Sequence, residues 1–108
     1  MKSLIFGLLL TASLTAAQGK QTFTGTITDD MCPAGDHSRM RMGNTNTECT
    51  IACIGSHGAA YVLYDGKNAY GLSDQRAPEK FAGQKVTITG TLDAKTKVIR
   101  VDSITASR

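Results

Sequence analysis

Two stretches of alternating residues, 21–28 and 85–92, constrain the fold of this 108-residue chain more than any other feature. In each stretch threonines occupy every second position, and mainly apolar residues lie between them. A period of two predicts half-buried β-strands with the threonines on one face. Each stretch has a glycine near its middle, Gly25 and Gly90, which in a strand marks a bulge or a sharp bend. A small, strongly coiled β-barrel requires strands of this kind.

Three further strands are predicted between and after these two. Residues 61–64 and 68–72 flank a turn at 65–67, and the Asp-Gly-Lys sequence of this turn is a hairpin signal. The last strand covers 98–104 and follows a turn at 93–97. The chain is therefore expected to form five strands.

Two helical pieces are expected to interrupt the strands. One runs from Glu48 to Ile54, because Thr47 suits an N-cap and Gly55 suits a helix stop. The other is a single turn over 78–82, which begins with proline. This order predicts a mainly β fold: a small five-stranded OB-like barrel with a short cysteine-bearing helix after the first strand and a helical turn before the fourth. A β-sandwich is the alternative.

The first residues have the composition of a secretory signal peptide. Lys2 precedes an apolar run at 4–10, and small residues follow it up to Ala17. The apolar run is far shorter than the roughly 20 residues that span a bilayer, so no membrane span is expected. We therefore expect a signal peptide at 1–17 and a single domain at 18–108, exported to the periplasm or the extracellular space.

The charge of the expected mature chain argues against nucleic acid as a partner. Removal of the signal peptide takes one of the 12 basic residues and none of the 9 acidic ones, which leaves a net charge near +2. Such a weak charge gives little attraction for phosphates. A domain of this size buries a modest core, so a bound metal or a disulfide would add useful stability.

The side chains that favour soft metals are gathered in one segment. Every cysteine, every histidine and every methionine except Met1 falls between residues 31 and 58. Thiol, imidazole and thioether groups are ligands of zinc and copper. The members of this segment are Met31, Cys32, His37, Met40, Met42, Cys49, Cys53 and His57.

The spacing within this segment predicts a metal site. Cys49 and Cys53 are four residues apart on the predicted helix, so both thiols point from one face. They lie about 6 Å apart there, whereas a disulfide needs Cβ atoms about 4 Å apart, so they are not expected to bridge each other. Cys32 and His37 lie on the preceding loop, where a turn would aim both at the helix. These four residues supply the four-coordinate shell that zinc prefers, and His57 is an optional further ligand.

Copper is the second metal that this segment suits. Copper(I) needs fewer thiolates than zinc does, and thioether sulfur is an acceptable ligand for it. Met31, Met40 and Met42 would then be possible soft ligands. The sequence therefore predicts an exported small protein of the cell envelope that binds copper or zinc.

A disulfide is the structural alternative for the cysteines. Export places them in an oxidising compartment, where Cys32 could bridge either Cys49 or Cys53 and pin the loop to the helix. The protein would then be an OB-type module that binds a small ligand on its barrel face. Tyrosine rings at the surface would offer stacking platforms. The possible stacking residues are Tyr61, Tyr64 and Tyr70.

A thiol-redox role with one cysteine as nucleophile is a third possibility. The two-residue spacing of paired redox cysteines is absent, which argues against it. Asp29 and Asp30 end the first strand and are interpreted as turn residues rather than as a catalytic pair. The sequence also has no hydrolase triad motif, no phosphate-binding glycine loop and no metalloprotease helix. A protein that is not an enzyme is therefore expected.

The chain resembles a group of small exported bacterial proteins of uncharacterised function. The resemblance extends over almost the whole chain after the expected signal peptide, and it implies an OB-like barrel into which a cysteine-containing loop and helix are inserted. It implies no activity. The residues that carry it are Gly25, Ile27, Asp29, Met31, Cys32, Glu48, Cys49, Cys53, Gly55, Tyr61, Val62, Leu63, Phe81, Ala82, Gly83, Val86, Thr89, Gly90 and Leu92.

Overall fold

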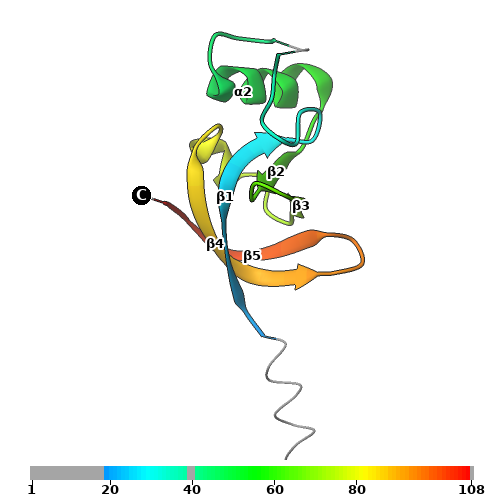
Figure 1. Ribbon diagram of the computed structural model, residues 1–108, viewed down its shortest axis with the longest axis vertical. Coiled ribbons are helices and arrows are strands. Elements are labelled where there is room, and N and C mark those ends of the chain that lie inside the picture. The colour runs from blue at the N-terminus through cyan, green and yellow to red at the C-terminus, as the bar shows by residue number, and fades with distance from the viewer. Residues whose placement is uncertain (1–18, 39–40, 108) are drawn as a thin grey trace, which may run out of the picture.

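The computed structural model describes residues 19–38 and 41–107 (Figure 1). The expected signal peptide at 1–17 lies outside the described residues. The described residues form five strands, one α-helix and one short 3-10 helix. Their bounds in chain order are β1 (Gln21–Asp29), α2 (Asn46–His57), β2 (Tyr61–Tyr64), β3 (Ala69–Leu72), η1 (Ala77–Phe81), β4 (Lys85–Asp93) and β5 (Val98–Ala106).

The five strands form one sheet that closes into a ring. The order around the ring is β1-β2-β3-β5-β4, and β4 pairs back onto β1. All pairs are antiparallel except β3 with β5, which is parallel. The mainly β prediction with five strands is confirmed. The sheet does not split into two packed layers, so the β-sandwich alternative is wrong.

The core of the ring is built from the inward residues of all five strands. The predicted alternation holds, because β4 is buried at Val86, Ile88 and Gly90 and more exposed between them. Full burial of an aliphatic side chain stabilises the fold by about 1.5–3 kcal/mol. The core members are Ile27, Tyr61, Leu63, Leu72, Ala82, Val86, Ile88 and Ile99.

Both mid-strand glycines lie where another strand comes close. A Cβ atom on Gly25 would meet the backbone carbonyl of Tyr64, and one on Gly90 would meet the carbonyl of Arg100. The pairing of β4 with β5 shifts its register between Thr89 and Gly90, which is the predicted bulge. The glycines therefore allow these strands to curve into a closed ring.

Helix α2 is longer than predicted at both ends. Its N-cap is Thr45 rather than Thr47, and the Thr45 hydroxyl accepts a hydrogen bond from the Glu48 backbone N–H at 3.1 Å. Gly55 lies inside the helix, which ends instead at Gly58 in the left-handed conformation, with φ of 67°. The local pattern placed the C-terminal end too early because an exposed glycine costs a helix only about 1 kcal/mol.

The helix packs over the end of β1, where the last three residues of the strand are buried on both faces. Figure 1 shows α2 lying across one end of the ring, with the tip of β1 directed at it. Thr47 fixes this placement by donating a hydrogen bond to the Ala82 carbonyl oxygen at 2.7 Å. Thr28 and Asp29 are consequently 1% and 0% exposed, although strand alternation alone would leave one of them at the surface.

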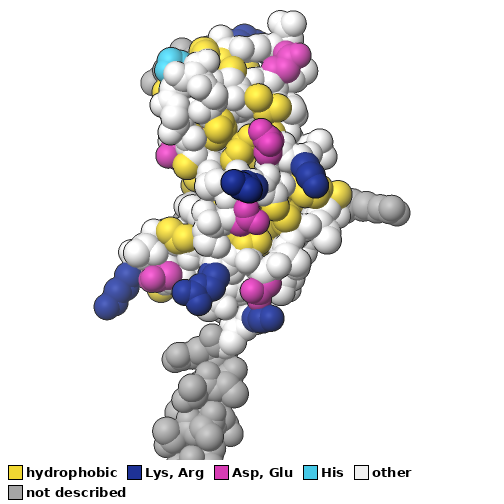
Figure 2. All heavy atoms as spheres, turned by 180° about the vertical axis from the view of Figure 1, so that it is seen from behind, with side chains coloured by type: hydrophobic (Ala, Val, Ile, Leu, Met, Phe, Trp, Pro, Cys, Tyr) yellow, Lys and Arg dark blue, Asp and Glu magenta, His cyan; other side chains and the backbone are white. Residues whose placement is uncertain are grey.

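The surface shows no concentration of one charge sign on the face seen in Figure 2, where basic and acidic side chains lie among one another. Lys20 and Asp102 form an ion pair with a nitrogen–oxygen distance of 3.1 Å.

Within residues 19–38 and 41–107, none of the helices has the length and apolar character needed to cross a membrane.

Two glycine substitutions test this description of the fold. Gly90→Ala should destabilise the protein by about 1–3 kcal/mol, since its Cβ would press on the Arg100 carbonyl. Gly55→Ala should instead stabilise it by about 0.5–1 kcal/mol, because Gly55 is helical and nothing lies within 4 Å of a Cβ there. Urea unfolding of both variants measures the two free energies. Opposite signs support the structure, and a neutral Gly90→Ala contradicts it.

Candidate metal centre

The site begins with the carboxylate of Asp29, the last residue of β1. Its Oδ1 accepts hydrogen bonds from the backbone N–H groups of Met31 at 3.1 Å and Cys32 at 3.0 Å. The hydroxyl of Thr28 donates to the Cys32 carbonyl oxygen at 3.0 Å. These bonds fold the chain back directly after the strand and hold Cys32 beside Asp29.

A second turn brings His37 to the same carboxylate. Gly35, with φ of 75°, donates its N–H to the Cys32 carbonyl oxygen at 2.8 Å and reverses the chain. His37 is 6% exposed. Its Nε2 lies 3.0 Å from Asp29 Oδ2, and its Nδ1 lies 3.3 Å from the side-chain oxygen of Asn46 on α2. Both ring nitrogens therefore face oxygen atoms.

Asp29, Cys32 and His37 together form a group with the geometry of a metal site. One ligand atom from each residue lies within 4.8 Å of the other two. Asp29 and His37 are buried and Cys32 is half-buried, so the group lies just below the surface. It offers one oxygen, one sulfur and one nitrogen, all of which are zinc ligands in proteins.

All three cysteines of the chain lie among the described residues, and none forms a disulfide. Cys49 and Cys53 are buried on the face of α2 that covers β1, and the Cys49 thiol donates to the Gly43 carbonyl oxygen at 3.4 Å. The structure therefore contains neither of the two alternative disulfides, Cys32–Cys49 and Cys32–Cys53.

Two of the thiols are held in their protonated form by their surroundings. Burial raises the pKa of Cys32, and the negative charges of Asp29 and Asp36 raise it further. Burial also raises the pKa of Cys53, followed by the charge of Asp29 and a side-chain hydrogen bond to it. Thiols of this kind are weak nucleophiles at neutral pH.

The structure assembles the predicted ligands only in part. Cys32 and His37 come together, whereas Cys49 and Cys53 are buried on α2 and are not members of the close group, although the Cys53 side chain is hydrogen-bonded to Asp29. His57 is exposed in the last turn of α2, also outside the group.

Two of the three methionines predicted as soft ligands, Met31 and Met42, lie among the described residues. Met31 is 39% exposed, and its backbone N–H donates to Asp29 Oδ1 at 3.1 Å. Met42 is half-buried on the loop before α2. Met40 lies outside the described residues.

Sequence reasoning missed Asp29, which it treated as a turn residue. Asp29 does shape a turn through Oδ1, but its other oxygen is directed at His37. The available signal was the spacing, with an aspartate at the end of a predicted strand and a cysteine three residues later. Strand alternation alone did not show that α2 would bury this carboxylate.

The tyrosines are not a shared stacking surface. Tyr61 is 2% exposed in the core, and burial followed by the charge of Glu79 raises the pKa of its hydroxyl. A buried ring offers no face to a ligand, so the prediction for Tyr61 is wrong. Tyr64 is half-buried and donates to the Gly66 carbonyl oxygen, and Tyr70 packs at a tilt against Phe23 with ring centroids 6.0 Å apart.

The geometry argues against a cysteine nucleophile activated by His37. A catalytic cysteine needs a histidine nitrogen directed at its sulfur. In this structure Asp29 occupies one nitrogen of His37 and Asn46 occupies the other. Since the pKa of Cys32 is also raised, the group suits cation binding better than thiol chemistry.

No protein-family model, curated protein or solved structure matches this chain.

The state of the thiols gives a direct prediction for protein isolated without reductant. Denatured protein should show three free thiols, whereas folded protein at pH 8 should react with iodoacetamide only at half-buried Cys32. That reaction should be much slower than for an exposed thiol, because the pKa of Cys32 is raised. Mass spectrometry counts the adducts. A single free thiol after denaturation would restore the disulfide alternative.

Proposed function

We propose that this protein is an exported metal-binding protein of the cell envelope that holds zinc, or copper, at Asp29, Cys32 and His37. The observation that carries this proposal is the mutual approach of three different ligand atoms within 4.8 Å in a half-buried group. The composition of residues 1–17 supports export. The proposal does not require catalysis, and we propose a binding function rather than an enzyme.

The surroundings of His37 support a cation at this position. Nε2 lies beside a carboxylate oxygen of Asp29, and an ionised carboxylate only accepts, so a hydrogen or a cation is expected between the two atoms. If Nδ1 donates its hydrogen to Asn46, a metal ion can replace the hydrogen between Nε2 and the Asp29 carboxylate. The hydrogen bond from a metal-bound histidine to a second residue is a common feature of protein metal sites. Asn46 supplies that second residue.

The distances are compatible with zinc. Tetrahedral zinc with bonds of about 2.0–2.2 Å to nitrogen and oxygen places two such ligands about 3.3 Å apart. The observed Nε2–Oδ2 distance of 3.0 Å is close to this value. A thiolate at about 2.3 Å from zinc would lie about 3.6 Å from each of the others. Small side-chain shifts would therefore close the shell, with a fourth position left for water or a further ligand.

The donor set favours zinc over copper. The carboxylate oxygen of Asp29 is a hard ligand, which copper(I) disfavours and zinc accepts. Zinc is therefore the metal that we test first.

We further propose that the fold is an OB-like barrel. The closed order β1-β2-β3-β5-β4 and the parallel contact between β3 and β5 support this proposal. An OB-fold is a five-stranded Greek-key barrel. In this chain α2 covers one end of the ring, and that is where the metal would bind.

The proposed ligands predict a clear order among variants. Zinc affinity should fall by more than about 100-fold in Cys32→Ser and in His37→Gln, because each loses a direct ligand. His57→Gln is the matched control, since His57 is exposed and should leave affinity unchanged. Competition with a chromogenic zinc chelator measures the affinities. Equal loss in the control and the two ligand variants would refute the site.

Zinc binding should also release protons. Because the pKa of Cys32 is raised, its thiol is protonated at pH 7 and must lose the proton on binding. Affinity should therefore increase with pH, by about tenfold per unit for one released proton. Calorimetry in buffers of different ionisation enthalpy counts the released protons, and Cys32→Ser should release one fewer. An affinity that is constant from pH 6 to pH 8 would contradict thiolate ligation.

A further inference from the structure

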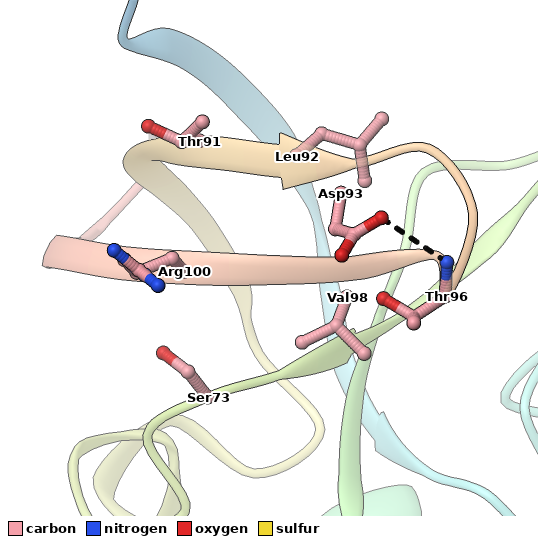
Figure 3. A pocket seen from close by; sticks show the side chains of 7 residues that line it. All are labelled: Ser73, Thr91, Leu92, Asp93, Thr96, Val98 and Arg100. Atoms are coloured by element: carbon pink, nitrogen blue, oxygen red, sulfur yellow. Dashed lines mark hydrogen bonds between the residues drawn. The ribbon is translucent and has the colours of Figure 1, made fainter.

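The β4–β5 hairpin lies at the end of the ring opposite α2 (Figure 1). It carries a cavity, which Figure 3 shows from close by. The cavity measures about 530 Å³ and lies between this hairpin and Ser73, the residue that follows β3. Its volume is in the range of cavities that hold small molecules. It shares no residue with the candidate metal centre and does not depend on the function proposed for that centre.

The pairing register places the charged residues of this cavity on one face of the hairpin. Thr91 pairs with Arg100, and Asp93 pairs with Val98. Alternate residues of a strand share a face, so these four side chains lie on the same face. Asp93 and Arg100 are diagonal neighbours, a relation that separates Cα atoms by about 7–8 Å.

The two opposite charges do not neutralise each other. No ion pair joins Asp93 to Arg100 in the part of the chain that the structure describes. Asp93 Oδ1 instead accepts hydrogen bonds from the backbone N–H groups of Lys95 at 2.9 Å and Thr96 at 3.3 Å. Figure 3 shows Arg100 at one end of the cavity, with Asp93 and Thr96 at the end nearer the turn.

Between Asp93 and Arg100 the cavity is lined by apolar side chains and by side-chain hydroxyl groups. Val98 is half-buried, and Leu92 packs partly on the core. Ser73 Oγ accepts a hydrogen bond from the Val101 backbone N–H at 2.9 Å, which leaves the hydroxyl hydrogen of Ser73 available to a ligand. Thr91 adds a further exposed hydroxyl.

We propose that this cavity binds a small zwitterion of the amino-acid or dipeptide class. The carboxylate of the ligand is held by Arg100 and its ammonium group by Asp93, with a short aliphatic side chain on Val98. A simple anion would face the carboxylate of Asp93, and a simple cation would face the guanidinium of Arg100. Only a ligand with both charges is complementary to both ends.

The expected affinity is modest. Both charged side chains are exposed, and water and salt screen exposed ion pairs. A dissociation constant in the millimolar range is therefore expected, with weaker binding as salt is raised.

The test uses L-alanyl-L-alanine as the probe, followed by amide chemical shifts of the full mature chain. The expected result is a saturable shift at the amides of Ser73, Val98 and Arg100. N-acetylation of the dipeptide, or its conversion to the methyl ester, removes one charge and should weaken binding about three- to tenfold. Arg100→Gln and Asp93→Asn should weaken binding of the free dipeptide by a similar factor.

Matched controls separate binding from misfolding. The amide introduced by Asp93→Asn keeps a side-chain oxygen for the turn, and Lys95→Gln changes a charge on the same turn outside the cavity. Lys95→Gln should bind the dipeptide as the unaltered protein does, and all three variants should retain its dispersed spectrum. Absence of saturable shifts overturns the proposal. Equal binding of the free and blocked dipeptides, or equal weakening by Lys95→Gln, also overturns it.

Discussion

The buried carboxylate of Asp29 is the group on which the helix end of the ring depends. A buried charge is costly unless its oxygens are hydrogen-bonded. Oδ1 accepts two backbone N–H groups of the loop, and Oδ2 lies against His37. Since His37 also contacts Asn46, the carboxylate links the end of β1, the loop and the start of α2 into one network. A cation between Asp29 and His37 would add a positive charge where this network is most deeply buried.

The ring separates two regions with different chemistry. At one end α2 covers β1 and encloses thiols, an imidazole and a carboxylate. At the other end the β4–β5 hairpin exposes a carboxylate and a guanidinium across an open cavity (Figure 3). Both regions depend on the closed ring, which the glycines permit where Gly25 approaches β2 and Gly90 approaches β5. The metal and the zwitterion are therefore proposed as independent ligands.

The strands could be predicted from sequence because their signals are local. Alternation, mid-strand glycines and the turn at 65–67 each act within a few residues, and β2 was predicted with its observed bounds. The membership of the site was less predictable, because it arises from contact between α2 and β1. This contact buries Asp29, and the turns after β1 bring Cys32 and His37 to it, whereas Cys49 and Cys53 are buried on α2 outside the close group. No periodicity within the loop or the helix encodes that selection.

X-ray absorption at the zinc edge of zinc-loaded mature protein tests the central claim most directly, because it reports the ligand atoms themselves. The account predicts a mixed shell, with sulfur at about 2.3 Å and nitrogen and oxygen at about 2.0–2.2 Å from zinc. Substitution of Cys32 by serine should remove the sulfur contribution. A shell of nitrogen and oxygen alone in the unaltered protein would contradict a site built from Asp29, Cys32 and His37.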